Sequence, residues 1–219
     1  MKRQIHTLVT PVLTLAAMFI AVPVFAGPPL LCHPFDIGHA RSLPWDGGGG
    51  WSDGKSDYKV DRVVADTEAL LTSSTPVLVR METLRRASLY ASTNAEVAKQ
   101  LLSRLLARAS ASEAAGHPDA LAFLDAAYVT EAYREIASMS ASPEFAGRAE
   151  GVQTAIGTAD GYALISRSVA ARPDDPAIHF AAALIAADKN RARYADHATK
   201  ARAGGTTDPL LAKNLKLVQ

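Results

Sequence analysis

The sequence contains a single cysteine, Cys32, among 219 residues, so no disulfide can form within the chain. It also lacks an excess of charge of either sign, since 23 basic and 22 acidic residues give a formal net charge of +1. That balance offers no general attraction to nucleic acid or to an anionic membrane surface, and we expect neither as a partner. Strict alternation of apolar and polar residues, typical of a half-buried strand, is missing too. The absence of strand patterns predicts an all-α protein.

Residues 1–26 have the organisation of a secretory signal peptide. Lys2 and Arg3 precede an uncharged stretch from Leu8 to Phe25, and Ala26 ends a Val-Phe-Ala sequence of the kind that signal peptidase cleaves. We therefore expect cleavage after Ala26 and a mature protein in the periplasm or outside the cell. The alternative is an uncleaved anchor, but two prolines interrupt the apolar stretch and no basic residue follows it closely. Stable membrane insertion is not expected once the peptide is removed.

Residues 27–57, the N-terminal arm, are predicted to be extended and to end in a flexible loop. Four prolines, both tryptophans and the glycine run at 47–50 fall in this segment, and neither proline nor consecutive glycines favour regular structure. The arm also carries large apolar side chains. We expect these to pack along a helical body, and they are Phe35, Ile37, Leu43 and Trp45.

From Tyr58 onward apolar residues recur every three to four positions, which predicts a helical domain over residues 58–219. Proline, glycine and capping residues divide it into segments. The predicted helices span 60–71, 76–92, 94–116, 117–141, 147–156, 158–171, 176–187 and 189–203, with a short last helix from Asp208-Pro209. Basic residues of these helices are expected on solvated faces, at Arg85, Arg86, Lys99, Arg104 and Arg108.

The last third of the chain contains a repeated pattern. Asp175-Pro176 recurs as Asp208-Pro209 after 33 residues, each at the start of a predicted helix. Before the first copy, a small, a bulky and a second small residue precede a closing proline, at Gly161, Ile165, Ser168 and Pro173. This spacing resembles the tetratricopeptide repeat, whose units are antiparallel helix pairs of about 34 residues. The resemblance covers residues 158–217, and Tyr194 departs from it where a small residue is expected.

The resemblance implies antiparallel helix hairpins that stack into a superhelix and bind a protein or peptide in a concave groove. The alternative fold is an ordinary helical bundle with similar loops. No Gly-x-Ser-x-Gly elbow marks a nucleophile, and the histidines at 117, 179 and 197 are dispersed, as expected for surface or packing residues. The leading hypothesis is thus an exported protein-binding or scaffolding module of the cell envelope, rather than an enzyme.

A literal match to the phosphate-binding loop G-x-x-x-x-G-K-[ST] runs from Gly49 to Ser56. That loop requires a buried strand before it and a helix directly after it. The residues at 41–46 do not form a buried-strand pattern, and an exported chain is separated from the cytoplasmic ATP pool. A solvated hinge is therefore the preferred interpretation, and no nucleotide cofactor is expected.

The densest group of potential metal ligands is also in the arm. Cys32, His33, Asp36 and His39 lie within eight residues, and a thiolate, two imidazoles and a carboxylate together can bind zinc or copper. No Cys-x-x-Cys pair or His-Glu-x-x-His helix accompanies them. The alternative to a metal- or thiol-dependent activity at Cys32, His33 and His39 is a structural segment in which the cysteine packs as a small apolar residue.

Overall fold

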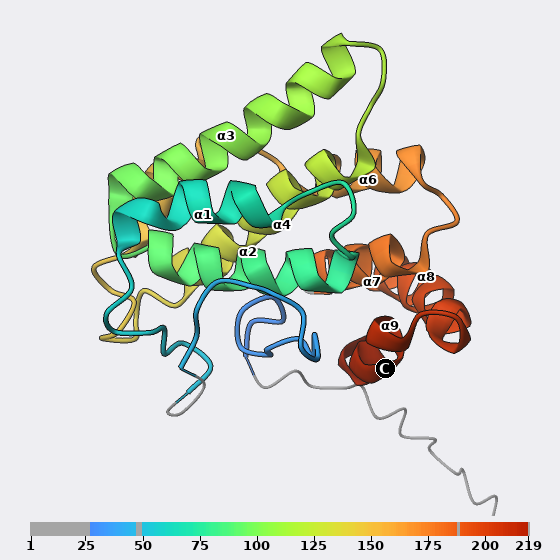
Figure 1. The fold of residues 1–219 in the computed structure, drawn as a ribbon, viewed down its shortest axis with the longest axis horizontal. Coiled ribbons are helices and arrows are strands. Elements are labelled where there is room, and N and C mark those ends of the chain that lie inside the picture. Colours follow the sequence, from blue (N-terminus) through green and yellow to red (C-terminus); the bar gives the residue numbers. More distant parts are fainter. Residues whose placement is uncertain (1–26, 47–49, 188, 219) are drawn as a thin grey trace, which may run out of the picture.

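The computed structural model describes residues 27–46, 50–187 and 189–218, and the regular structure in these ranges is helical (Figure 1). The α-helices are α1 Val63–Leu70, α2 Val77–Ala91, α3 Ala95–Ala114, α4 Ala120–Ser138, α5 Ala149–Ile156, α6 Gly161–Ala171, α7 Pro176–Ala186, α8 Arg191–Ala203 and α9 Pro209–Asn214. Short 3-10 segments lie at Val60–Arg62, Gly204–Thr206 and Leu215–Val218. The prediction of an all-α protein is confirmed. The predicted signal peptide lies outside the described residues.

Most of the helices begin at a side chain that accepts hydrogen bonds from the first turn. Such a cap replaces the helical partner that the first backbone N–H groups lack. The capping residues are Asn94, Asp119, Asp160, Asp175, Asn190 and Asp208. None of the helices within the described residues is long and apolar enough to cross a membrane.

Helix α4 occupies the centre of the helical body. It packs against α2, α3, α5, α6 and α7, and the side chains of Tyr128 and Tyr133 on it are fully buried. In a solenoid each unit contacts only its neighbours along the chain. Helix α4 also contacts α2, α6 and α7, which are not adjacent to it in the sequence, so this part of the protein packs around one buried helix.

The N-terminal arm lies across α2 and contributes to the same core (Figure 1). Phe35, Ile37 and Leu43 are buried, as predicted, whereas Trp45 is only partly buried. The ring of Phe35 packs edge-on against Tyr128 at 6.4 Å and against Phe180 at 6.0 Å between centroids. The arm thus closes the end of the bundle between α4 and α7.

The prediction of a solvated basic face is wrong for Arg85. Its side chain is 0% exposed, and its guanidinium donates to the carbonyls of Leu31 and Trp51 in the arm. Arg86, 20% exposed, donates to the Leu43 carbonyl at 2.6 Å. The physical reason is that an irregular segment has no helical partners for its carbonyls, so α2 supplies them. Lys99 and Arg104 are exposed.

Candidate functional site

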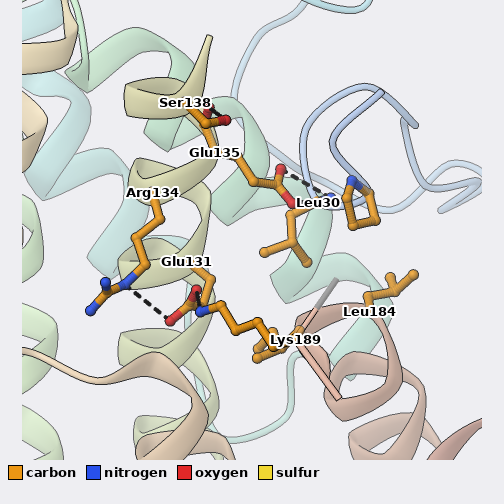
Figure 2. Close-up of a pocket in the computed structure, with 9 residues that line it drawn as sticks. Leu30, Glu131, Arg134, Glu135, Ser138, Leu184 and Lys189 are labelled. Carbon is orange, nitrogen blue, oxygen red and sulfur yellow. Dashed lines mark hydrogen bonds and ion pairs between the residues drawn. The ribbon is translucent and has the colours of Figure 1, made fainter. Parts of the chain in front are cut away.

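A hollow of about 170 Å³ lies where the arm meets α4 and the C-terminal end of α7 (Figure 2). Its walls combine apolar and charged side chains. The lining residues are Pro29 and Leu30 of the arm, Glu131, Arg134, Glu135 and Ser138 of α4, Leu184 and Ile185 of α7, and Lys189 just after α7. The residues on α4 follow one another at helical spacing, so a single helix face supplies both carboxylates of the site.

Glu131 is the most deeply placed charged group of the hollow, with 5% of its side chain exposed. Its carboxylate accepts the backbone N–H of Gly161 at 3.1 Å and lies 3.3 Å from the guanidinium of Arg134. The ammonium of Lys189 donates to its other oxygen. A buried carboxylate is stable only when such partners replace water. Glu131 is therefore a fixed negative group with basic partners on the solvent side.

Gly161 must be small because Glu131 occupies the space beside it. A Cβ at this position would come within 2.5 Å of the Glu131 side chain. Ile165 and Ser168 on the same helix are buried as well, and the Ser168 hydroxyl donates to the Ala120 carbonyl of α4. The small and bulky positions that suggested a repeat are thus the positions where α6 packs on α4.

Glu135 lies one turn after Glu131 and binds the arm. Both of its oxygens accept the backbone N–H of Leu30, at 3.0 and 3.2 Å. The Leu30 carbonyl in turn accepts a hydrogen bond from the buried Tyr128 hydroxyl at 2.6 Å. The rim of the hollow is therefore built by a backbone segment that α4 side chains hold at both its N–H and its carbonyl.

The charged side chains of the hollow already have partners. Two carboxylates and two basic side chains balance one another in charge, and both carboxylates already accept backbone N–H groups. Apolar contacts come from Leu30 and Leu184 beside them.

The four predicted metal ligands do not come together as a ligand group. Cys32 and His33 are partly buried, whereas Asp36 and His39 are exposed. Within the described residues no three His, Cys, Asp or Glu side chains are grouped so that they could hold a metal ion. A zinc or copper site at these residues stays a prediction that would require the arm to rearrange.

Two of these residues have other contacts. The Asp36 carboxylate accepts the Gly38 N–H at 2.9 Å and lies 3.6 Å from the ammonium of Lys213. Burial, with a smaller contribution from the negative charge of Glu135, raises the pKa of the Cys32 thiol to about 11. A raised pKa favours the neutral thiol, which is a poor metal ligand and a poor nucleophile.

The segment that resembles a phosphate-binding loop is held by an aromatic side chain. Gly49 lies outside the described residues, but the Lys55 N–H donates to the Tyr90 hydroxyl at 2.7 Å, and that hydroxyl donates to the Pro44 carbonyl at 2.7 Å. A Cβ at Gly54 would come 2.5 Å from the Tyr90 ring. The described residues before Gly47 form no strand, and regular structure resumes only at Val60. The context that a phosphate-binding loop requires is absent from this part of the structure.

Two of the dispersed histidines meet. The Nδ1 atoms of His179 on α7 and His197 on α8 are 2.9 Å apart, and His179 is 2% exposed. His117 is exposed. The sequence contained a signal for this pair, because the predicted helices 176–187 and 189–203 carry one histidine each, at equal distances from the break between them. The Glu131 site had no such signal, since its partners come from α4, α6 and the segment after α7.

The chain matches no family model, and comparisons with curated proteins and with solved structures found no match either.

Proposed function

We propose that the mature chain is an exported binding module that holds another protein or a peptide, and that part of this partner enters the hollow beside Glu131 and Glu135. One observation carries the proposal. Glu135 already binds the backbone N–H of Leu30, in an irregular segment, with both of its oxygens. The site therefore has the chemistry that recognises an extended backbone of another chain.

The size of the hollow favours a piece of a larger partner. Pockets that enclose whole small ligands usually measure about 300–1,000 Å³, whereas this hollow measures about 170 Å³. A volume of this size suits one side chain or one chain end, as at the buried anchor points of protein interfaces. Because Arg134 and Lys189 balance the two carboxylates, the partner segment is expected to carry little net charge.

We also propose that α6 to α9 are degenerate tetratricopeptide-like units. Asp175 accepts the N–H groups of Ala177 and Ile178, and Asp208 accepts those of Leu210 and Leu211, so the two Asp-Pro copies cap their helices in the same way. Repeats of that type bind proteins or peptides, which supports the same class of partner.

Export is the other part of the proposal, and mass spectrometry of the native N-terminus tests it. The mature protein should begin at Gly27, because the Val-Phe-Ala sequence before it is an acceptable cleavage signal. An intact N-terminus at Met1 in the membrane fraction would contradict this.

Site-specific photo-cross-linking tests the binding site. A photoreactive phenylalanine at Ser138, on the exposed rim of the hollow, should cross-link a discrete partner in envelope extracts. The matched control is the same group at Ser110, an exposed position on α3. A partner captured at Ser138, absent at Ser110 and lost when Lys189→Glu changes the charge of the rim supports the proposal. Equal capture at both positions would overturn it.

The alternative function remains a metal- or thiol-dependent activity that uses Cys32, His33 and His39. Its requirement is stoichiometric zinc or copper in the purified mature protein, which elemental analysis measures directly.

A further inference from the structure

The contact between His179 and His197 joins two neighbouring helices through titratable groups. Their Nδ1 atoms are 2.9 Å apart, and the Nε2 atom of His179 lies 2.7 Å from the Pro173 carbonyl oxygen. The rings are inclined by 30° with centroids 5.1 Å apart. The pair therefore connects α8 to α7 and to the segment before α7.

The hydrogen positions of the neutral pair follow from these partners. A carbonyl oxygen only accepts, so Nε2 of His179 must carry a hydrogen and donate to Pro173. The Nδ1 atom of neutral His179 is then an acceptor, and the Nδ1 atom of His197 must donate to it. One arrangement of hydrogens thus satisfies both contacts, with both imidazoles neutral.

Protonation affects the two histidines differently. His197 can gain a proton at Nε2 and still donate from Nδ1. A proton on Nδ1 of His179 is accommodated only if His197 moves its own hydrogen to Nε2 and accepts at Nδ1. Protonation of both rings would place two N–H groups, and two positive charges, face to face across 2.9 Å. Burial, and next the proximity of His179, lower the pKa of His197 below its usual 6.5, while Asp196 opposes the shift. The closed contact therefore accommodates one proton and disfavours a second.

The charged groups around the two histidines do not offset the repulsion between two protonated rings. Asp196, Lys200 and Arg193 act on His197 and all lie on α8, and Asp196 is already 3.1 Å from Lys200. Apart from His179, helix α7 carries no titratable side chain. On the connection from α6, Arg172 lies 3.9 Å from Asp175, whose carboxylate caps α7.

Arginines and carboxylates of the other helices that pack on α7 are paired away from the histidines. On α2 and α4, Arg80 pairs with Asp125, and Glu131 with Lys189. On α6, Arg167 pairs with Glu113 of α3. Arg202 of α8 donates a hydrogen bond to the Val218 carbonyl in the C-terminal segment. Asp196 is thus the one carboxylate among the groups that act most on His197.

We propose that His179 and His197 form a pH-sensitive latch, which holds α8 on α7 near neutral pH and releases it under mildly acidic conditions. Besides the histidine pair, α8 is held by the buried Ala198 and Ala201, by the partly buried Tyr194 and by the bond from Arg202 to the Val218 carbonyl. Opening exposes both imidazoles to water, where both can be protonated. Acid therefore drives the opening by mass action on the open state.

Hydrogen exchange measures the opening directly. Rates for residues 191–203 should be compared at pH 7.5 and pH 5.5 after correction for the intrinsic pH dependence of exchange. If the closed state excludes the second proton, the opening constant of α8 should rise about tenfold, and up to about a hundredfold if it excludes both. Segments of α4 provide the internal reference and should not change. An α8 opening constant that is equal at the two pH values would overturn the proposal.

A double variant separates the latch from a general effect of acid. In His179→Gln with His197→Asn the side chains keep N–H donors but do not titrate, so the pH dependence of α8 exchange should fall to within about twofold. The matched control is His117→Asn, an exposed histidine at the start of α4, which should behave as the unmodified protein. Retention of the full pH dependence in the double variant would overturn the proposal.

Nuclear magnetic resonance of the unmodified protein gives a second measurement that does not depend on the variants folding. Both imidazoles should titrate together with the loss of α8 amide protection. Independent titration of the two rings near pH 6.5, with α8 fully protected throughout, would show that there is no latch.

Discussion

The two ends of the described chain are attached to the helical body in different ways. The N-terminal arm lacks helical partners for its backbone, so buried polar side chains bind it: Glu82 accepts the Phe35 N–H at 3.0 Å and Arg86 donates to the Leu43 carbonyl. Helix α8 satisfies its own backbone, and it is held by the buried Ala198 and Ala201, the partly buried Tyr194 and one histidine pair. The irregular arm is thus held by hydrogen bonds from charged side chains, whereas the helix α8 is held mainly by side-chain packing.

The need of the arm for hydrogen-bond partners explains why α2 carries charged side chains that are buried. Glu82 also accepts hydrogen bonds from Arg85 and Arg86. One carboxylate thus orients two guanidiniums that donate to three carbonyls of the arm, those of Leu31, Leu43 and Trp51. A charge placed there is costly unless every partner is present. The arm should therefore be lost cooperatively when one of these groups is removed.

The largest expected loss of unfolding free energy is that of Glu82→Gln. The amide keeps the size of the side chain but removes the charge that balances Arg85, whose side chain is fully buried, and Arg86. Breaking a buried ion pair in this way costs about 3–5 kcal/mol of unfolding free energy. Urea unfolding of the mature protein measures it.

The control for this substitution is Glu68→Gln on α1, an exposed carboxylate for which no more than about 0.5 kcal/mol is expected. A loss below 1 kcal/mol for Glu82→Gln would show that the charges on α2 are not what holds the arm.

Trp45→Ala removes an apolar contact of the arm without removing a charge, so it separates the contribution of packing from that of the charged groups on α2. Its ring packs edge-on against Tyr90 at 5.4 Å, and the Arg85 guanidinium lies 4.9 Å from its centroid. Because the side chain is only partly buried, the expected loss is about 1–3 kcal/mol. At about 2–4 °C per kcal/mol for a chain of this size, calorimetry should show a lower Tm. An unchanged Tm would mean that this part of the arm does not contribute to stability.

The helices could be predicted closely because their signals are local. Asn94, Asp160 and Asp208 were expected near helix starts, and each caps a helix in the structure. Apolar periodicity located the segments between them. The 3-10 type of the short segments at the ends of helices was not predicted, since a few residues carry no periodicity.

The partners of the arm could not be predicted because they are distant in the sequence. Arg85 and Leu31 are 54 residues apart, and Glu131 and Lys189 are 58 residues apart. A basic residue on a helix has the same local pattern whether it faces water or a covering segment. The hydrophobic residues of the arm indicated that it would dock, but not that charged groups on α2 would receive it.

Cys32→Ser should have a smaller effect than Trp45→Ala, below about 1 kcal/mol, because a hydroxyl replaces a partly buried thiol of similar shape. The thiol itself provides a sharper measurement. With a pKa of about 11, it should react with iodoacetamide at pH 8 about tenfold more slowly than in the urea-unfolded chain. If a chelator accelerates labelling of the folded protein, the metal-site alternative gains support and the structural role of the arm cysteine is contradicted.

The smallest effect is expected for Lys55→Ala, and the neighbouring glycine shows why. Lys55 is exposed and its ammonium is 3.6 Å from an exposed Asp57 carboxylate, so its removal should change the unfolding free energy by less than about 0.5 kcal/mol. Gly54→Ala should cost about 1–3 kcal/mol, because the added methyl group meets the Tyr90 ring at 2.5 Å.

These two adjacent positions distinguish packing from phosphate binding in the same motif. If the loop bound a nucleotide, Lys55 would be the residue that matters, and titration calorimetry would detect saturable micromolar ATP binding that Lys55→Ala abolishes. We expect no such binding in either protein. Because Tyr90 fixes the loop through the Lys55 backbone N–H rather than its side chain, only the glycine substitution should loosen the arm, and hydrogen exchange of residues 50–58 should show it.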